Sequence, residues 1–186
     1  TEYDYWKIFP RMPRKVTLGD ITVRDGFQHL EKFISTRAKI FYAEELIFAG
    51  CRNIEVTNLG NAYLMPQFSD AEDLLAHLRS DRFKKRCARK GVSYDDICIT
   101  AVTIRETGVD RAIELKKKGV GPDRILMMVS TEEEHHFANS GTTLPAYWSE
   151  AERCIRKCTD AGIKMCCTVS TIWGSPIAGA TNMKDA

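Results

Sequence analysis

The sequence lacks the features of a membrane-spanning or exported chain. No apolar run among its 186 residues approaches the roughly 18 residues that cross a bilayer. Residues 1–13 contain aromatic and basic side chains but no continuous apolar core of the kind that a signal peptide has. We therefore expect no membrane partner and a cytoplasmic location.

The sequence also lacks a strong excess of charge of either sign. Charged residues make up 28% of the chain, yet the formal net charge is only +2. Such a balance does not produce the large positive field that attracts nucleic acid. We expect no nucleic-acid partner, and we interpret the basic stretch 79–90 as a solvated helix face, a simpler reading than a phosphate site.

Two common cofactor motifs are missing as well. No G-x-G-x-x-G sequence follows the first predicted strand, which counts against a dinucleotide-binding fold. Seven cysteines are present, an odd number, without a histidine or further cysteine at zinc-ribbon spacing. They fall within apolar or helical patterns, which indicates reduced, buried thiols. Cys154 and Cys158 can share one helix face, where a metal pair is the alternative to a core role.

What the sequence does contain is a regular alternation of strand and helix patterns with short connections. Such units require parallel strand pairing and right-handed crossovers. The alternation favours a (β/α) barrel or an open doubly wound sheet. The strands are predicted at 16–23, 52–57, 96–103, 124–130 and 163–170, and the helices at 36–49, 69–80, 105–118 and 146–161. Ser35 and Ser69 are predicted as helix caps, and residues 132–136 as a solvated acidic loop.

Polar side chains gather at or just past the carboxyl ends of these strands. In a barrel the carboxyl ends form one rim, and active sites are built there. The sequence therefore predicts a site at this rim rather than a set of unrelated surface turns. The residues concerned are Arg24, Asp25, Gln28, Glu55, Thr57, Asn58, Thr103, Arg105, Ser130 and Ser170.

The charged pair Arg24-Asp25, followed by Gly26, is the most informative part of this set. An aspartate carboxylate can hold a hard divalent cation, and a guanidinium can stabilise a developing oxyanion. Gly26 lets the backbone pass close to a ligand. The alternative is a surface ion pair that closes a strand-to-loop turn.

Three segments carry a family resemblance. The run 24–28, R-D-G-F-Q, resembles the R-D-G-x-Q signature of the metal-dependent (β/α)₈ barrel enzymes of the hydroxymethylglutaryl-CoA lyase and isopropylmalate synthase group, the pyruvate carboxyltransferase-type domain. Residues 53–58 with Pro66-Gln67 resemble the second-strand segment of the lyases, and 167–176 resembles their fifth-strand segment. Phe27 is closer to the lyase branch, because the synthases usually carry an acidic residue there.

The resemblance implies an enzyme that cleaves a carbon–carbon bond in a 3-hydroxyacyl-CoA by a retro-Claisen route. It implies that Asp25 binds Mg²⁺ or Mn²⁺, that Arg24 stabilises the enolate oxygen, and that Glu55 lies beside the metal. The implied contacts to substrate or to these groups come from Gln28, Thr57 and Ser170. The alternative role for Glu55 is a purely structural ion pair with Arg24.

The chain is shorter than the barrel that it resembles. A (β/α)₈ barrel needs eight strands and about 250 residues, so we expect the N-terminal five units, with the C-terminal strands missing and the fifth strand exposing an edge. The family's His-x-His pair and catalytic cysteine belong to later segments and are not in these 186 residues. We divide the chain into an N-terminal arm, 1–15, whose aromatic residues are consistent with a homodimer, and a partial barrel domain, 16–186.

Three alternatives stay open at this point. The first is a synthase that condenses an acyl-CoA with a 2-oxo acid by related chemistry. The second is an aldolase that acts on 4-hydroxy-2-oxo acids and uses a divalent cation in the same way. A catalytically silent binding or scaffold chain is the alternative from a different class, because the later histidines are missing.

Overall fold

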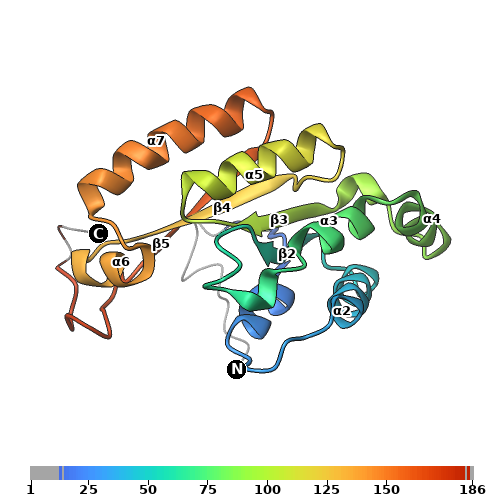
Figure 1. Ribbon diagram of the computed structural model, residues 1–186. Helices are drawn as coiled ribbons and strands as arrows, with labels where there is room; N and C mark the ends of the chain where they lie inside the picture. The colour runs from blue at the N-terminus through green and yellow to red at the C-terminus, as the bar shows by residue number, and fades with distance from the viewer. Residues whose placement is uncertain (1–12, 14, 183, 185–186) are drawn as a thin grey trace, which may run out of the picture.

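The computed structural model describes residues 13, 15–182 and 184. Its five strands form one parallel sheet in the order β1-β2-β3-β4-β5 (Figure 1). A doubly wound sheet reverses its strand order at a switch point, whereas sequential order is that of a (β/α) barrel. The barrel prediction is confirmed, and the chain forms a five-stranded partial barrel. The strands are β1 Gly19–Asp20, β2 Asn53–Asn58, β3 Cys98–Val102, β4 Arg124–Ser130 and β5 Lys164–Ser170.

Helices follow each of the first four strands of the sheet. Three of them are short turns of three to five residues, and the others are regular α-helices. The short turns are η1 Thr22–Gly26, η2 Pro66–Phe68 and η3 Tyr94–Asp96. The α-helices are α2 Thr36–Phe48, α3 Ala71–Arg79, α4 Asp81–Arg89, α5 Glu106–Lys117, α6 Glu133–Ser140 and α7 Leu144–Asp160.

One apolar cluster joins the helices to one face of the sheet. Ile54, Ile99 and Ile125 of the three central strands are fully buried in it, together with apolar residues of α2, α3, α5 and α7. Because successive side chains of a strand point to opposite faces, Thr100 and Arg124 face the inner side, where the Arg124 Nε donates to the Thr100 Oγ1 at 3.0 Å. The inner wall of the barrel is therefore polar at this level.

The first predicted strand is much shorter than expected. Only Gly19–Asp20 pairs with β2, and Val16 and Leu18 are 68% and 75% exposed. The Asp20 side chain ends the strand, because its Oδ1 accepts the Thr22 amide at 2.8 Å and turns the chain into η1. The prediction of a strand over 16–23 is wrong for this reason.

The other strands and most helix ends agree with the sequence to within two residues. Ser35 caps α2, since its hydroxyl oxygen accepts the Ala38 amide at 3.3 Å. The cap predicted at Ser69 is wrong: Asp70 is the N-cap of α3, and its side chain makes no capping bond. The Asp70 carboxylate is used by Lys39 instead, at 2.7 Å.

Of two charged segments, one differs from its prediction, and the other, the basic stretch predicted as a solvated helix face, agrees with it. The stretch 132–136 is not a loop: Glu132 caps α6, and His136 is buried within that helix. The basic stretch forms α4, which follows Arg79, and the Arg79 Nε donates to the Gly121 carbonyl near the start of β4 at 2.9 Å. This helix lies at the amino end of the strands, away from α6 (Figure 1).

The last strand is open to solvent along most of its length. Cys166 and Cys167 of β5 are exposed, so the prediction of buried thiols is wrong for these two. Cys154 and Cys158 are fully buried, and burial raises the pKa of Cys154 to about 12 and that of Cys158 to about 11. Both side chains belong to the buried apolar cluster, so the core interpretation holds for this pair.

The structure bears on two further predictions, those of membrane spans and of the N-terminal arm, only for the described residues. No helix in the described part of the chain is both long and apolar enough to cross a bilayer. Most of the predicted N-terminal arm, residues 1–12 and 14, lies outside the described residues. The division into an arm and a barrel domain stays a prediction.

Candidate active site

Arg24 is the centre of the candidate site. Its Nε and Nη2 donate to the Glu55 Oε2 at 2.9 and 2.6 Å, and its Nη1 donates to the Asp25 Oδ1 at 2.5 Å. The Arg24 side chain is 8% exposed and that of Glu55 is 12% exposed. The structure thus brings together the three residues to which the sequence assigned the chemistry.

The turn η1 explains why Arg24 points inward. The Ile21 carbonyl accepts the amides of Arg24, Asp25 and Gly26, at 3.1, 2.7 and 3.4 Å. This wide turn winds the chain directly after β1, so the arginine is aimed at the neighbouring strand. β2 supplies Glu55 from a position flanked by the outward-facing Ile54 and Val56, which places the carboxylate on the inner wall.

Contacts within the described residues use only part of the hydrogen-bonding capacity of the Arg24 guanidinium. An arginine side chain carries five N–H donors, and three of them are used by Glu55 and Asp25. A desolvated guanidinium with free donors is suited to an oxyanion, because the surrounding protein has already paid the cost of orienting it. Two N–H groups of Arg24 therefore have no hydrogen-bond partner among the described residues.

Asp25 and Glu55 are the residues that fit a hard divalent cation. The Asp25 side chain is 44% exposed, and its Oδ2 accepts no hydrogen bond from any other described residue. The Glu55 Oε1 is likewise without a partner among the described residues. Carboxylate oxygens are the ligands that Mg²⁺ and Mn²⁺ prefer, often one or two of them with water. Residues 13, 15–182 and 184 contain no group of three or more His, Cys, Asp or Glu side chains that could hold a metal ion.

The three residues predicted to contact substrate are not bonded to this cluster in the described chain. In the described chain no hydrogen bond joins the side chain of Gln28, Thr57 or Ser170 to Arg24, Asp25 or Glu55. A register shift in β2 after Glu55 pairs Thr57 with the outward-facing Ala101, and Thr57 is 1% exposed. Ser170 ends β5 opposite Ser130. Their roles stay predictions.

Other polar residues of the predicted rim serve local structure. The Thr103 hydroxyl is buried and accepts the Arg105 amide at 3.2 Å. The Arg105 guanidinium turns to Glu150, at 3.1 Å. The Asn58 Oδ1 accepts the Gly60 amide at 2.7 Å and shapes the loop after β2.

The end of β4 carries a serine–histidine pair that the sequence patterns did not reveal. The Ser130 Oγ lies 2.7 Å from the His135 Nδ1, in the first turn of α6. Glu132 caps this turn by accepting the Glu134 and His135 amides at 2.6 and 2.9 Å. Burial raises the pKa of the Glu132 carboxyl, but these bonds outweigh it and the net shift is downward.

The structural roles of two residues that hold the site loops were also missed. Gln67 is 4% exposed and Lys39 is 1% exposed, and both link the loop after η1 to the loop after β2. One signal was present in the sequence: Lys39 lies four and eight residues before Ala43 and Ile47, on the buried face of its helix. A lysine on an apolar helix face requires a buried partner.

Comparisons with known proteins identify the family of this chain. The family model described as HMGL-like matches residues 15–186. The hydroxymethylglutaryl-CoA lyase YngG of Bacillus subtilis (strain 168) is 25% identical over 164 residues, which are 88% of this chain and 49% of that protein.

Solved structures show the same fold. The hydroxymethylglutaryl-CoA lyase of Pseudomonas aeruginosa superposes with a TM-score of 0.78 at 18% identity, over 94% of this chain and 52% of that one. The HMG-CoA lyase of Acinetobacter baumannii, in complex with coenzyme A and 3-methylmalate, gives 0.75 at 19% identity, over 91% and 49%. The chain spans about half the length of the relatives that it matches. With the family model matching nearly all of its residues, the chain belongs to the HMGL-like family.

Proposed function

We propose that this chain forms the N-terminal part of a divalent-metal-dependent carbon–carbon lyase that cleaves a 3-hydroxyacyl-CoA of the hydroxymethylglutaryl-CoA type. The observation that carries the proposal is the desolvated Arg24 guanidinium, held by Glu55 and Asp25 with donors left for a ligand. The similarity to lyases, at 25% identity with YngG, supports the same reaction class. The predicted homodimer and cytoplasmic location stay predictions.

The chemistry requires negative charge to move onto an oxygen. When the 3-hydroxyl loses its proton, the bond between C2 and C3 breaks and its electron pair passes to the thioester, which becomes an enolate. Arg24 stabilises that enolate oxygen through the two N–H groups that Glu55 and Asp25 leave unused. One well-placed donor of this kind lowers the barrier by about 3 to 4 kcal/mol.

Glu55 has two parts in this proposal, and Asp25 shares one of them. Asp25 and Glu55 are the residues that would hold Mg²⁺ or Mn²⁺, and the bound cation would lower the pKa of the substrate hydroxyl. Glu55 also fixes the plane of the guanidinium, because one carboxylate oxygen accepts from both Nε and Nη2. The guanidinium is thereby oriented before substrate binds.

The test uses the full-length protein that contains this chain. Incubation with hydroxymethylglutaryl-CoA should release acetoacetate, and Arg24→Gln should reduce turnover by about 100-fold to 1,000-fold with the melting temperature little changed. Unchanged turnover in the variant removes the oxyanion role. Release of free CoA thiol from acetyl-CoA plus a 2-oxo acid, without acetoacetate from the first substrate, assigns the protein to the synthases instead.

Metal titration separates the enzyme from a silent scaffold. The isolated chain, with Asp25 and Glu55 as its hard ligands, should bind Mn²⁺ with a dissociation constant of about 1 mM or weaker, because two carboxylates form only an incomplete coordination shell. Full-length protein should bind far more tightly, as measured by calorimetry. Equally weak binding by both favours the scaffold.

A further inference from the structure

The Gln67 side chain connects two loops that are distant in sequence. Its Nε2 donates to the Leu30 and Lys32 carbonyls at 2.6 and 2.7 Å, and its Oε1 accepts the Ile34 amide at 3.1 Å. Gln67 lies in η2, after β2, whereas the three backbone groups belong to the loop after η1. One buried amide thus uses both of its donors and its acceptor on a single loop.

Lys39 of α2 holds Gln67 from the other side. Its ammonium donates to the Gln67 carbonyl and, at 2.7 Å, to the Asp70 Oδ1, and it lies 4.3 Å from the centre of the Phe33 ring. The Asp70 Oδ2 is buried without a hydrogen-bond partner in the described chain. Lys39 is therefore the group that compensates this carboxylate, and the two charges depend on each other.

A purely structural role accounts poorly for so much buried polarity. Desolvating a lysine and an aspartate is costly, and well-packed apolar residues usually serve stability as well or better. What the polar groups provide is direction, because a hydrogen bond fixes the positions of the atoms it joins more narrowly than an apolar contact does. The segments that they fix relative to each other follow directly after η1, which carries Arg24, and β2, which carries Glu55.

We infer that Gln67 and Lys39 are positioning residues that clamp the loop 29–34 to the loop after β2, and so hold the Arg24 guanidinium against Glu55. The inference rests on the proposed function for its catalytic consequence. The clamp itself is a property of the fold and has a separate readout. A displacement of about 1 Å at a reacting group can cost about 100-fold in rate, so a loosened clamp should lower turnover.

The first experiment compares turnover in variants of the full-length protein. Gln67→Met keeps the volume and removes all three bonds, and Lys39→Met combined with Asp70→Asn removes both charges without leaving one unpaired. Each should lower kcat by about tenfold or more with KM changed less than about threefold, because the guanidinium is displaced while the binding surface stays.

The matched control is Tyr94→Phe. The Tyr94 hydroxyl donates to the Leu78 carbonyl at 3.0 Å and is half-buried, at the opposite end of the strands. Its loss should lower the melting temperature to a similar degree as Gln67→Met and leave kcat unchanged. If Gln67→Met has the same kcat as this control, the positioning role is wrong.

The second experiment measures amide hydrogen exchange and needs no activity. The amides of Arg24, Asp25 and Gly26 bond to the Ile21 carbonyl within η1, and Gln67→Met should speed their exchange by about tenfold, since a loosened loop lets the turn open more often. Faster exchange at Ile34 alone overturns the clamp. Wild-type protein without lyase activity overturns the proposed function, while the exchange data still decide the clamp.

Discussion

Two clusters of ion pairs in this chain contain the same residue types and serve different ends. At the ends of β1 and β2, the guanidinium of Arg24 and the carboxylate of Glu55 are almost fully shielded from water. Between α5 and α7, the Glu106 carboxylate accepts from Arg153 and Lys157 at 2.9 Å each, with exposed or half-exposed side chains. The first cluster is on the inner wall of the barrel and the second lies on its outer surface.

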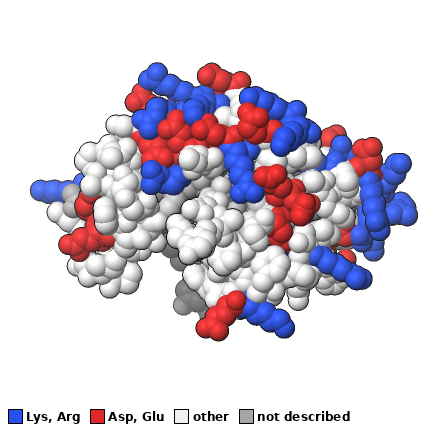
Figure 2. Space-filling model, viewed as in Figure 1, with Lys and Arg blue, Asp and Glu red and all other residues white. Residues whose placement is uncertain are grey.

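The difference teaches that the environment, more than the pairing, decides what an ion pair does. Figure 2 shows positive and negative side chains mixed along the upper part of the molecule, over α5 and α7. There water and salt screen each pair, so the pairs help to keep two helices in place at little net gain. At Arg24 the same attraction acts in a medium of low polarity, where it is strong enough to orient a group for chemistry.

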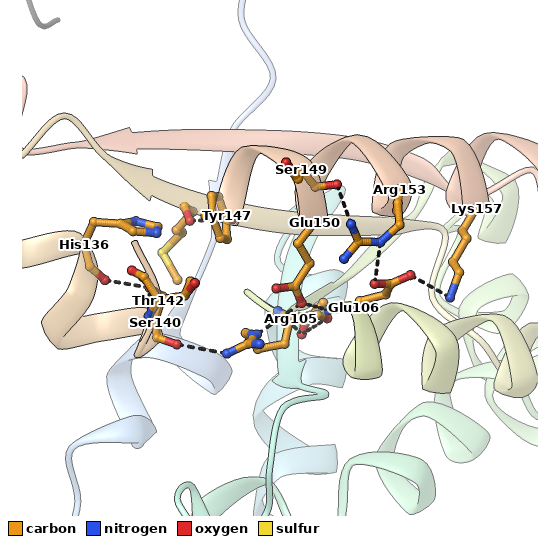
Figure 3. A network of polar contacts seen from close by, with 12 residues as sticks. Arg105, Glu106, His136, Ser140, Thr142, Tyr147, Ser149, Glu150, Arg153 and Lys157 are labelled. Atoms are coloured by element: carbon orange, nitrogen blue, oxygen red, sulfur yellow. Dashed lines mark hydrogen bonds and ion pairs between the residues drawn. The ribbon is translucent and has the colours of Figure 1, made fainter. Parts of the chain in front are cut away.

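Glu150 shares features of both clusters, because it is buried like Glu55 and contacts α5 like the surface network. Glu150 of α7 is 8% exposed, and its Oε1 accepts the Arg105 Nε at 3.1 Å and the Glu106 amide at 2.6 Å (Figure 3). It thereby satisfies a free N–H at the start of α5. Its burial resembles that of Glu55, yet it accepts from a helix amide as well as from the Arg105 guanidinium, whose side chain is 47% exposed.

The largest effect is expected for Glu55→Gln. The change leaves Arg24 with Asp25 as its charged partner, and removing one member of a buried pair should lower the free energy of unfolding by about 3 kcal/mol. Turnover of the full-length protein should fall by about 100-fold, because the guanidinium loses its orientation. Denaturant titration and steady-state kinetics measure the two. A stable variant with full turnover would make the pair no different from the surface network.

A smaller effect is expected for Glu150→Ala. The variant loses the cap of α5 and the Arg105 contact, and should be less stable by about 1 to 2 kcal/mol. Turnover should stay within about twofold of wild type, since Glu150 faces α5. Thermal unfolding and the lyase assay provide the comparison with Glu55→Gln. A loss of turnover as large as that of Glu55→Gln contradicts the separation of the two clusters.

The smallest effect is expected for Glu106→Gln, and it depends on pH. Hydrogen bonds from Lys157 and Arg153 hold the pKa of Glu106 below its ordinary value of 4.5. A depressed carboxyl pKa stabilises the fold above the unfolded value, and this contribution disappears as the pH falls through the folded value. The difference in melting temperature between wild type and variant should be present at pH 7, shrink below pH 4.5, and weaken in high salt. A difference that grows on acidification has the wrong sign.

The sequence predicted the central residues of the site, but few of the contacts that hold the site loops in place. The motif around Arg24 and the strand end at Glu55 were recognised because their chemistry is encoded in residue type and spacing. Gln67 was noticed only as part of a resemblance, and its role depends on three backbone groups more than thirty residues away. No local pattern contains such a contact, since it exists only when two loops are packed together.

The predictions for the β5 cysteines and for the segment 16–23 were wrong for a related reason. Periodicity reports which residues are apolar, but whether a strand is covered depends on what lies beside it. Cys166 and Cys167 are apolar in pattern, yet the described chain leaves both faces of that strand open. Val16 and Leu18 alternate as a strand does, and the Asp20 turn ends the pairing.

By itself the sequence determined the order of strands and helices, because hydrophobic spacing and caps act within a few residues. It determined also that an arginine and an aspartate follow the first strand. Only the tertiary structure decided that Glu55 reaches Arg24, that Lys39 is buried against Asp70, and that Arg105 turns away to α7. These contacts join segments far apart in the chain, and their energies depend on burial that only packing creates.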